Sequence, residues 1–210
     1  MEQLLKDKVA IVTGAGSGIG AATAMAYARE GAKVIVSDIN EQGAEQVIAD
    51  IKAAGGGASF IKADVSKPED CEHLVAETVK QYGKLDIACN NAGIGGEVNL
   101  VVDMSVDGWH KIISVNLNSV FYCMKYQIAA MLKNGSGSIV NMSSILGQVA
   151  FPQSAGYVAA KHGVVGLTQN AAVEYATKEI RVNAVGPAFI DTPLLKNMDQ
   201  SVKQQLIARH

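Results

Sequence analysis

Short apolar segments rich in β-branched residues alternate along this chain with longer segments of helical periodicity. The short segments, at residues 9–13, 33–37, 58–63, 85–90, 138–143 and 180–185, are expected to form six strands. Between them, residues 19–29, 42–54 and 69–82 carry apolar side chains every three or four positions, which predicts crossover helices. Strands that are apolar throughout are typical of a parallel sheet with both faces covered. The alternation therefore predicts an α/β fold with one doubly wound parallel sheet flanked by helices on both faces.

Two later helices, expected around residues 114–132 and 155–177, are apolar on most of their faces. Their apolar residues include Val120, Phe121, Met124, Val164, Val165 and Leu167. A helix of this kind is buried against something on more than one side. Two interpretations stay open, because the helices can belong to the core of one chain or can also form an interface between subunits.

The length and charge of the chain limit the classes of partner. With 210 residues and 49% hydrophobic content, one sizeable core and a single domain over residues 1–210 are expected. The net charge of −2 is well mixed, which argues against binding of nucleic acid or an anionic membrane surface. No apolar run approaches the ~18 residues of a membrane span, and the polar N-terminus does not resemble an export signal. A small-molecule partner is expected.

The three cysteines, Cys71, Cys89 and Cys123, are odd in number, widely spaced and not clustered with histidine. This usage predicts a reducing, cytoplasmic location and no metal site.

A glycine-rich turn follows the first strand directly and leads into a helix. It reads Thr13-Gly14-Ala15-Gly16-Ser17-Gly18-Ile19-Gly20. Glycines allow the backbone to turn tightly and approach a ligand, and the free N–H groups of a helix N-terminus attract phosphate. The turn therefore predicts the pyrophosphate site of a dinucleotide, although glycines can also serve only the turn itself.

Asp38 ends the second strand, some twenty residues further on. A carboxylate there can accept both ribose hydroxyls of the adenosine half and would repel the additional phosphate of NADP. Neither Ser17 nor Ile39 supplies the positive charge that such a phosphate requires. NAD is therefore the expected cofactor, and the alternative is an Asp that is merely solvated at a strand end.

Tyr157 and Lys161 are four residues apart in a helical segment, so they lie on one face of that helix. An ammonium group and a cationic nicotinamide ring nearby would favour the phenolate and lower the tyrosine pKa from ~10 toward the working range. The fifth strand ends beside Ser143 and Ser144, either of which could donate to a developing alkoxide or carbonyl oxygen. Spacing alone does not separate the two serines.

Together these motifs resemble the short-chain dehydrogenase/reductase family, from Lys8 to about Pro193. The resemblance implies a Rossmann-type fold and assigns the family's T-G-x-x-x-G-x-G pyrophosphate motif to Thr13 and to the cofactor-binding residues Gly14, Ser17, Gly18, Ile19 and Gly20. Asp64-Val65 is similar to the Asp-Val pair that contacts adenine. Asn90-Asn91-Ala92-Gly93 matches the family's N-N-A-G, which places Asn91, Ala92 and Gly93 at the cofactor.

The same resemblance implies the catalytic residues Asn116, Ser144, Tyr157 and Lys161. The family's Ser-to-Tyr spacing selects Ser144 over Ser143, and Asn116 would hold the water that links Lys161 to solvent. Tyr157 and Lys161 would also contact the cofactor. The segment after the sixth strand, residues 186–193, is similar to the family's P-G loop, which brings Pro187, Ile190 and Thr192 to the cofactor. Members of the family are usually dimeric or tetrameric, so a homodimer or homotetramer is expected.

Two features depart from the family pattern. Ala188 stands where the family usually has glycine, which is acceptable if its φ is negative. The family also continues past the substrate loop, which begins near residue 187, into another helix and a seventh strand, whereas this sequence ends at His210. We therefore expect the sequence to be part of a longer protein.

The expected reaction is hydride transfer between NAD(H) and a secondary alcohol or ketone, with Tyr157 as general acid/base. An NADP-dependent 3-oxoacyl thioester reductase and a non-catalytic nucleotide-binding regulator are the alternatives. Substrate identity would depend on Ile94, Gly95, Gly96 and Glu97, on residues 148–153 and on the segment from Leu194 onward. Glu97 could pair with a polar substrate group, but a solvated loop glutamate is the preferred interpretation.

Overall fold

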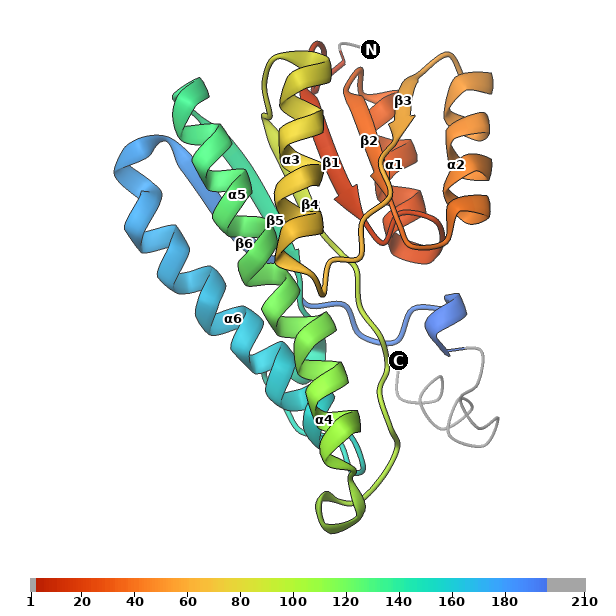
Figure 1. The fold of residues 1–210 in the computed structure, drawn as a ribbon, viewed down its shortest axis with the longest axis vertical. Coiled ribbons are helices and arrows are strands. Elements are labelled where there is room, and N and C mark those ends of the chain that lie inside the picture. The colour runs from red at the N-terminus through yellow and green to blue at the C-terminus, as the bar shows by residue number, and fades with distance from the viewer. Residues whose placement is uncertain (1–2, 196–210) are drawn as a thin grey trace.

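A parallel sheet of six strands is the centre of the fold in the computed structural model, which describes residues 3–195. The strands are β1 (Val9–Thr13), β2 (Lys33–Ser37), β3 (Gly57–Phe60), β4 (Ile87–Asn90), β5 (Gly137–Met142) and β6 (Ile180–Val185). Their order across the sheet is β3-β2-β1-β4-β5-β6 (Figure 1), and every neighbouring pair is parallel. From β1 the chain adds strands toward one edge of the sheet, and from β4 it adds them toward the other edge, as in a doubly wound Rossmann-type fold. The predicted fold class is confirmed.

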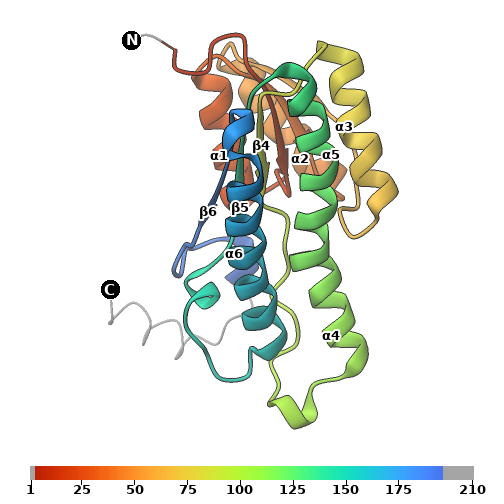
Figure 2. The ribbon, with the colours of Figure 1, turned by 90° about the vertical axis from the view of Figure 1, so that its left-hand side faces the viewer.

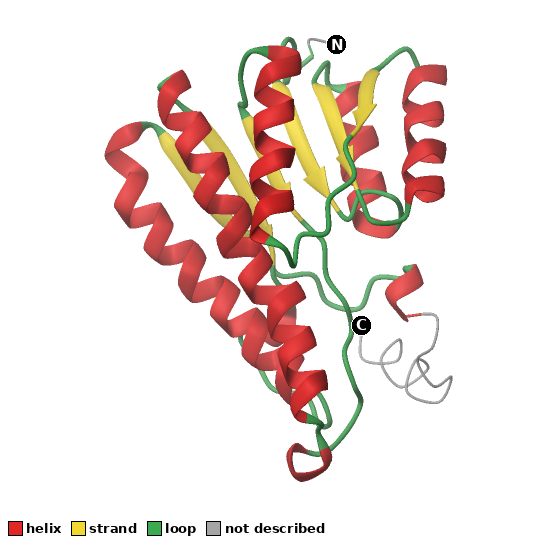
Figure 3. Ribbon diagram, in the orientation of Figure 1, coloured by secondary structure: helices red, strands yellow, loops and turns green. Residues whose placement is uncertain are grey.

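Helices cover both faces of this sheet (Figure 3). They are α1 (Gly18–Arg29), α2 (Glu41–Ala53), α3 (Pro68–Tyr82), α4 (Val106–Ile113), α5 (Ser119–Asn134) and α6 (Ala155–Tyr175). Figure 2 places α1 on one side of the sheet and α3 and α5 on the other. Because the strands are covered in this way, β1 is buried at all of its positions, as its unbroken apolar sequence predicts.

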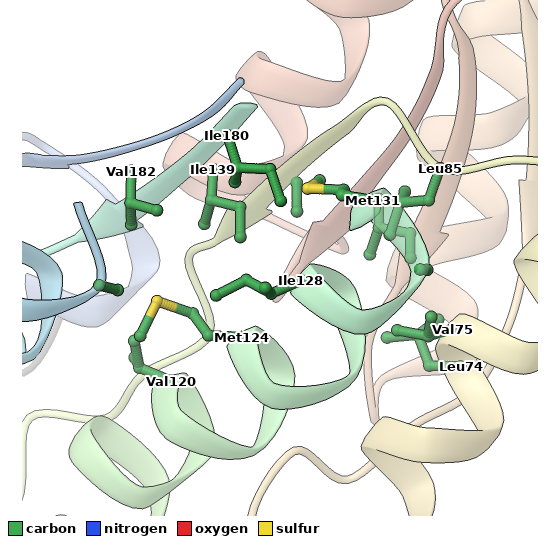
Figure 4. Packing of buried hydrophobic residues seen from close by; sticks show 14 of the residues in the cluster. Leu74, Val75, Leu85, Val120, Met124, Ile128, Met131, Ile139, Ile180 and Val182 are labelled. Atoms are coloured by element: carbon green, nitrogen blue, oxygen red, sulfur yellow. The ribbon is translucent and has the colours of Figure 1, made fainter. Parts of the chain in front are cut away.

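The two faces of the sheet are packed by separate apolar clusters, because successive side chains of a strand point in opposite directions. Val12 belongs to the cluster under α1 and α2, and its neighbour Ile11 to the cluster under α3, α5 and α6. Figure 4 shows the second cluster, in which Met124, Ile128 and Met131 of α5 lie against residues of β5 and β6. Fully burying a side chain of this size stabilises the fold by about 1.5–3 kcal/mol.

Two of the predicted strands are shorter in the structure. β3 covers Gly57–Phe60 instead of residues 58–63, and β4 starts at Ile87 instead of residue 85. Ala63 and Leu85, at these ends, are apolar and buried, but they lie in the connections beside the paired strands. A buried residue outside a strand has the same apolar character as one within it, so the apolar pattern predicted both strands to be longer than they are.

The helix predicted to begin near residue 114 begins at Val106. Ser105 caps it by accepting a hydrogen bond from the Gly108 N–H at 2.8 Å. A π-helical turn, Ser114–Asn118, then joins α4 to α5, which ends at Asn134. The predicted start therefore coincides with the π turn, where the apolar periodicity changes phase.

The apolarity of α5 and α6 is only partly explained by the core. Val120, Met124 and Val164 are buried, as expected. Phe121 is 50% exposed and Val173 on α6 is 81% exposed. The outer sides of the two helices therefore present apolar side chains to the surroundings of the chain.

Candidate active site

A cavity of about 630 Å³ opens at the carboxyl ends of the strands, next to the point between β1 and β4 where the strand order reverses. This is where ligands bind in open α/β sheets. Its walls include these predicted cofactor-binding residues: Gly14, Ser17, Gly18, Ile19, Asp38, Asp64, Val65, Asn91, Ala92, Gly93 and Thr192. The structure therefore brings together residues from five separate segments of the chain that the sequence motifs had assigned to one ligand.

The glycine-rich turn is shaped by backbone geometry that other residues would strain. Gly14 and Gly18 have φ values of 62° and 55°, in the left-handed region that favours glycine. Gly20 does not line the cavity. A Cβ on it would stand 2.2 Å from the Gly14 carbonyl oxygen, so Gly20 permits the turn to fold against the start of α1.

Asp38 follows β2 and is held by two backbone donors. Its carboxylate accepts hydrogen bonds from the Gly16 N–H and from the Asn40 N–H, each at 2.8 Å. One oxygen is therefore bonded to the glycine-rich turn and the other to the start of α2. Each carboxylate oxygen keeps further acceptor capacity for a ligand hydroxyl.

Asn91 joins the N-N-A-G segment to the glycine-rich turn. Its side-chain amide donates to the carbonyls of Thr13 and Gly14, both at 3.0 Å. In return, the Thr13 hydroxyl accepts from the N–H groups of Asn91 and Ala92, at 3.1 and 3.2 Å. The amide of Asn91 is thus used to fasten two cavity walls together, which the motif alone does not reveal.

The Asp64-Val65 pair forms another wall. The Asp64 carboxylate accepts from the N–H and the hydroxyl of Ser66, at 3.1 and 2.6 Å. Val65 is buried against Cys71 and Cys123, which are close enough for a thiol contact of 3.6 Å. The contact with the Cys71 thiol, and then burial, raise the pKa of Cys123 well above its ordinary value, so these cysteines act as packing groups here.

Several cavity-lining residues escaped the sequence analysis. Lys111, Ser114 and Val115 line the cavity from α4 and the π turn. Conversely, Pro187 and Ile190 were predicted to face the cofactor and do not line the cavity. The Pro187 carbonyl accepts from the Ile145 N–H at 2.8 Å, and Ile190 is 47% exposed.

Lys161 is buried beside the inner end of the cavity. Its ammonium donates to the Met142 carbonyl at 2.8 Å, and burial lowers its pKa to about 8. A Cβ on Gly93 would lie 3.8 Å from the Lys161 Nζ and 3.2 Å from the Asn116 Oδ1. Gly93 lines the cavity, so the buried lysine lies directly behind that wall.

Tyr157 and Ser144 face each other next to Lys161. The Lys161 Nζ lies 5.6 Å from the centre of the Tyr157 ring. Burial raises the pKa of Tyr157, and the Ser144 hydroxyl lowers that pKa by less. In the protein alone, desolvation of the phenolate therefore dominates, and the expected lowering depends on the cationic nicotinamide ring together with Lys161.

The structure separates the two serines that spacing could not. The Ser144 hydroxyl is close enough to Tyr157 to lower its pKa, and its Oγ accepts from the Leu146 N–H at 3.2 Å. The Ser143 hydroxyl points away and donates to the Lys161 main-chain carbonyl at 3.1 Å. Ser143 therefore fastens α6 to the end of β5, and Ser144 presents its hydroxyl to Tyr157.

Asn116 is fully buried in the π turn, and both polar atoms of its side chain are hydrogen-bonded to the backbone of Ile94. Its Nδ2 donates to the Ile94 carbonyl and its Oδ1 accepts from the Ile94 N–H, both at 2.8 Å. This paired contact fastens the loop after β4 to the π turn. The Asn116 side chain is thus less available for a water molecule than the sequence analysis expected.

A buried chain of amides supports this region from behind. Asn90 of β4 exchanges hydrogen bonds with Gln127 of α5 at 3.0 and 2.8 Å, and donates to Asn141 of β5 at 2.9 Å. Asn141 in turn donates to the Thr168 hydroxyl of α6 at 2.9 Å. Buried polar groups are costly unless paired, so this network holds the ends of β4 and β5 in register with both helices.

The Glu97 side chain is hydrogen-bonded to Ser105, the residue that caps α4. Its carboxylate accepts from the hydroxyl and the N–H of Ser105, at 2.7 and 3.1 Å. These bonds lower the pKa of Glu97. These contacts of Glu97 secure the N-terminus of α4.

Ala188 does not have a positive φ, since the non-glycine residues with positive φ among residues 3–195 are Asp7, Gln153 and Glu179. The substitution for glycine is therefore accommodated.

Over the same described range, no group of three His, Cys, Asp or Glu side chains is arranged to hold a metal ion. Within that range, too, every helix is too short or too polar to cross a bilayer. The remainder of the predicted substrate segment, from residue 196 on, lies outside the described residues.

The chain is similar to known proteins along nearly its whole length. A family model described as short chain dehydrogenase matches residues 8–203. Cyclohexanol dehydrogenase from Acinetobacter sp. (strain SE19) is 49% identical over 201 residues, which cover 96% of this chain and 80% of that protein. 3β-hydroxysteroid dehydrogenase from Mediterraneibacter gnavus is 45% identical over 200 residues, covering 95% and 72%. The crystal structure of levodione reductase superimposes with a TM-score of 0.90 at 39% identity, covering 96% of this chain and 78% of that one.

Proposed function

This chain belongs to the short-chain dehydrogenase family, and on that premise we propose that it is an oxidoreductase that transfers a hydride between NAD(H) and a secondary alcohol or its ketone. The observation that carries the proposal is the meeting of Ser144, Tyr157 and Lys161 behind Gly93, at the inner end of the dinucleotide cavity. An acid/base group, a hydrogen-bond donor and a cation beside a cofactor site are the parts that alcohol oxidation requires.

The cavity suits a dinucleotide in shape and in chemistry. Its floor is a glycine turn at the N-terminus of α1, where Cβ atoms on Gly14 or Gly20 would collide with neighbouring backbone. N–H groups at a helix N-terminus attract phosphate. A bound nicotinamide ring would supply the hydride acceptor and, when oxidised, a positive charge. Asp38 supports NAD over NADP, because its carboxylate is held at the cavity wall by two N–H groups.

The proton is handled by Tyr157. In the oxidation direction, the substrate hydroxyl proton passes to the Tyr157 phenolate oxygen, and Ser144 donates a hydrogen bond to the oxygen that becomes a carbonyl. Because burial raises the Tyr157 pKa in the protein alone, positive charge must be added to favour the phenolate. Lys161, whose pKa is about 8, is largely protonated at neutral pH and supplies part of that charge. It would also bind the ribose next to the nicotinamide.

The π turn provides the proposed route by which the proton reaches the solvent. Asn116 is bonded through its side chain to Ile94, so we assign the binding of a relay water to the backbone of Ser114–Asn118. A π turn shifts hydrogen bonds from the i+4 to the i+5 position, which releases a carbonyl to accept from such a water. This water would connect Lys161 with the solvent.

Secondary alcohols on carbon rings are the proposed substrates. The two related enzymes above are named for cyclohexanol and for a 3β-hydroxysteroid, and both names describe a hydroxyl on a ring. We propose the same class here. We also propose a homodimer or homotetramer, since Phe121 and Val173 expose apolar surface on the outer sides of α5 and α6.

Replacement of Tyr157 by Phe tests the proposed mechanism. The change removes only the phenolic oxygen, so NAD-linked oxidation of cyclohexanol should fall about 10³-fold, while NADH binding measured by fluorescence stays within about twofold. Tyr175→Phe is the matched control, because Tyr175 ends the same helix and packs against the core. Near-normal turnover by Tyr157→Phe would refute the assignment. Tight NADH binding without turnover of any alcohol by the unmodified protein would favour a nucleotide-binding regulator instead.

A further inference from the structure

We propose that Phe151 and Phe189 form an aromatic wall of the substrate site that selects ring-shaped alcohols over open-chain ones. The inference rests on the proposed oxidoreductase function and assigns substrate selection to Phe151, within the segment 148–153 named above, and to Phe189, which no motif of the sequence singles out. The two rings lie 6.3 Å apart between centres and are inclined by 61°, an edge-to-face arrangement that is favourable for aromatic pairs.

Backbone contacts bring the two phenylalanines to the catalytic residues. Beyond the last paired residues of β5 and β6, the Ser143 N–H donates to the Val185 carbonyl and the Ile145 N–H donates to the Pro187 carbonyl, both at 2.8 Å. A Cβ on Gly186 would lie 3.1 Å from the Ser144 carbonyl oxygen. The segment that leads to Phe189 therefore runs directly alongside Ser144.

Phe151 reaches the same place from the other direction. It lies in the connection between Ser144 and the start of α6. Tyr157 lies in the first turn of that helix. The contact of Phe151 with Phe189 closes this connection against the segment after β6. Ser144 and Tyr157 are thus flanked by two segments that the ring pair holds together.

The chemistry of both segments is apolar. Residues 145–151 (Ile-Leu-Gly-Gln-Val-Ala-Phe) and 187–190 (Pro-Ala-Phe-Ile) contain no charged side chain. Ile145, Val149 and Ile190 are 38%, 49% and 47% exposed. The cofactor cavity, in contrast, is lined by Asp38, Asp64 and Lys111. A substrate in contact with these segments therefore gains by burying hydrocarbon and finds no partner for a charge.

Ring-shaped alcohols profit from such a wall more than open-chain alcohols of equal size. A cyclohexane ring presents a rigid apolar face to the aromatic pair and has few torsions to lose on binding. A linear chain must order several torsions to make the same contact. The wall therefore discriminates by shape, at equal carbon number and equal chemistry of the reacting carbinol.

The test compares cyclohexanol with 2-hexanol, two secondary alcohols of six carbons, in unmodified protein and in Phe151→Leu and Phe189→Leu. We expect kcat/KM for cyclohexanol to fall at least fivefold in either variant, chiefly through KM, and kcat/KM for 2-hexanol to change less than twofold. Phe151→Tyr keeps a ring and should restore the preference. Phe60→Leu on β3 is the matched control, because that ring is also half-buried and lies outside both segments.

A second readout does not depend on turnover. Cyclohexanol, which cannot react with the reduced cofactor, should quench or shift the fluorescence of NADH bound to the protein, with a dissociation constant that rises at least fivefold in Phe151→Leu, while the affinity for NADH itself is unchanged. An unaltered ratio of cyclohexanol to 2-hexanol in both leucine variants overturns the inference, as does a preference of the unmodified protein for 2-hexanol. Absence of NAD-linked turnover of both alcohols in the unmodified protein overturns the proposed function instead.

Discussion

The two halves of the sheet contribute different kinds of chemical group to the site. The half formed by β1, β2 and β3 with α1 and α2 uses mainly backbone groups, namely the glycine turn and the N–H groups that hold Asp38. The half formed by β4, β5 and β6 with α5 and α6 uses side chains, including the buried Lys161 and the amide network behind it. The first half, which we call the nucleotide half, can therefore hold a ligand through the geometry of its backbone. The second half, which we call the catalytic half, requires buried polar groups for proton transfer.

The cores of the two halves reflect this division. Under α1 and α2 the buried residues are mainly apolar, such as Val12, Val34 and Ile51, and the buried polar side chains at the ends of β1 and β2 are the hydroxyls of Thr13 and Ser37. Behind the catalytic residues, the buried set includes Asn90, Gln127, Asn141 and Thr168. Polar side chains inside a core are stable only when every partner is present, so the catalytic half is the more exacting of the two.

The largest expected effect comes from closing the space in the nucleotide half. Gly20→Ala would place a Cβ 2.2 Å from the Gly14 carbonyl oxygen and 2.5 Å from the Asn91 Nδ2, which forces the turn away from α1. We expect the dissociation constant for NADH to rise about 100-fold or more, equal to about 2.7 kcal/mol. Fluorescence titration measures it.

Gly57→Ala provides the control for that experiment. A Cβ at Gly57 meets no atom within 4 Å, and its backbone does not require glycine. Its NADH affinity should match that of the unmodified protein. Equal affinities in all three proteins would show that the nucleotide half does not depend on the close approach of its glycines.

A smaller effect, on stability and on turnover together, is expected in the catalytic half. Asn141→Ala leaves Asn90 and Thr168 without one of their partners in a buried site, which costs about 3 kcal/mol of unfolding free energy. Urea unfolding measures this loss. Because Asn141 stands just before Ser143 and Ser144, kcat should fall about tenfold while the affinity for NADH changes little.

Ser37→Ala is the corresponding change at the end of β2. Within residues 3–195, the buried Ser37 hydroxyl has no hydrogen-bond partner, so its removal should cost almost nothing or stabilise the fold. The comparison between the halves fails if Ser37→Ala destabilises the protein as much as Asn141→Ala does.

The same division explains what could be predicted from the sequence. The parallel sheet and the glycine turn followed from apolar strands and from glycines, because both are local requirements on the backbone. Gly14 and Gly18, which line the cavity, have the positive φ that favours glycine. The start of α4 was missed, because its cap depends on Ser105 and Glu97 rather than on apolar periodicity.

Side-chain roles in the catalytic half were harder to predict, because they depend on contacts between distant segments. Nothing near Ser143 in the sequence indicates that its hydroxyl bonds to the Lys161 carbonyl, and nothing near Asn116 indicates its pairing with Ile94. The raised pKa of Tyr157 is similarly a result of burial, which spacing to Lys161 does not report. Such contacts emerge only when the sheet and helices are assembled.

The smallest expected effect concerns the choice between NAD and NADP, which depends on one charge in the nucleotide half. Asp38→Asn removes the charge but keeps an oxygen that can accept from Gly16 or Asn40, whereas Asp38→Ala also removes the acceptor. We expect the asparagine variant to bind NADP about tenfold more tightly than the unmodified protein, equal to about 1.4 kcal/mol, and the alanine variant to show the same gain with a further loss of NAD affinity. Fluorescence titration with both reduced cofactors separates the two contributions. If the unmodified protein binds NADPH more tightly than NADH, the carboxylate does not govern the preference, and Lys111, a cation that lines the cavity, becomes the group to replace.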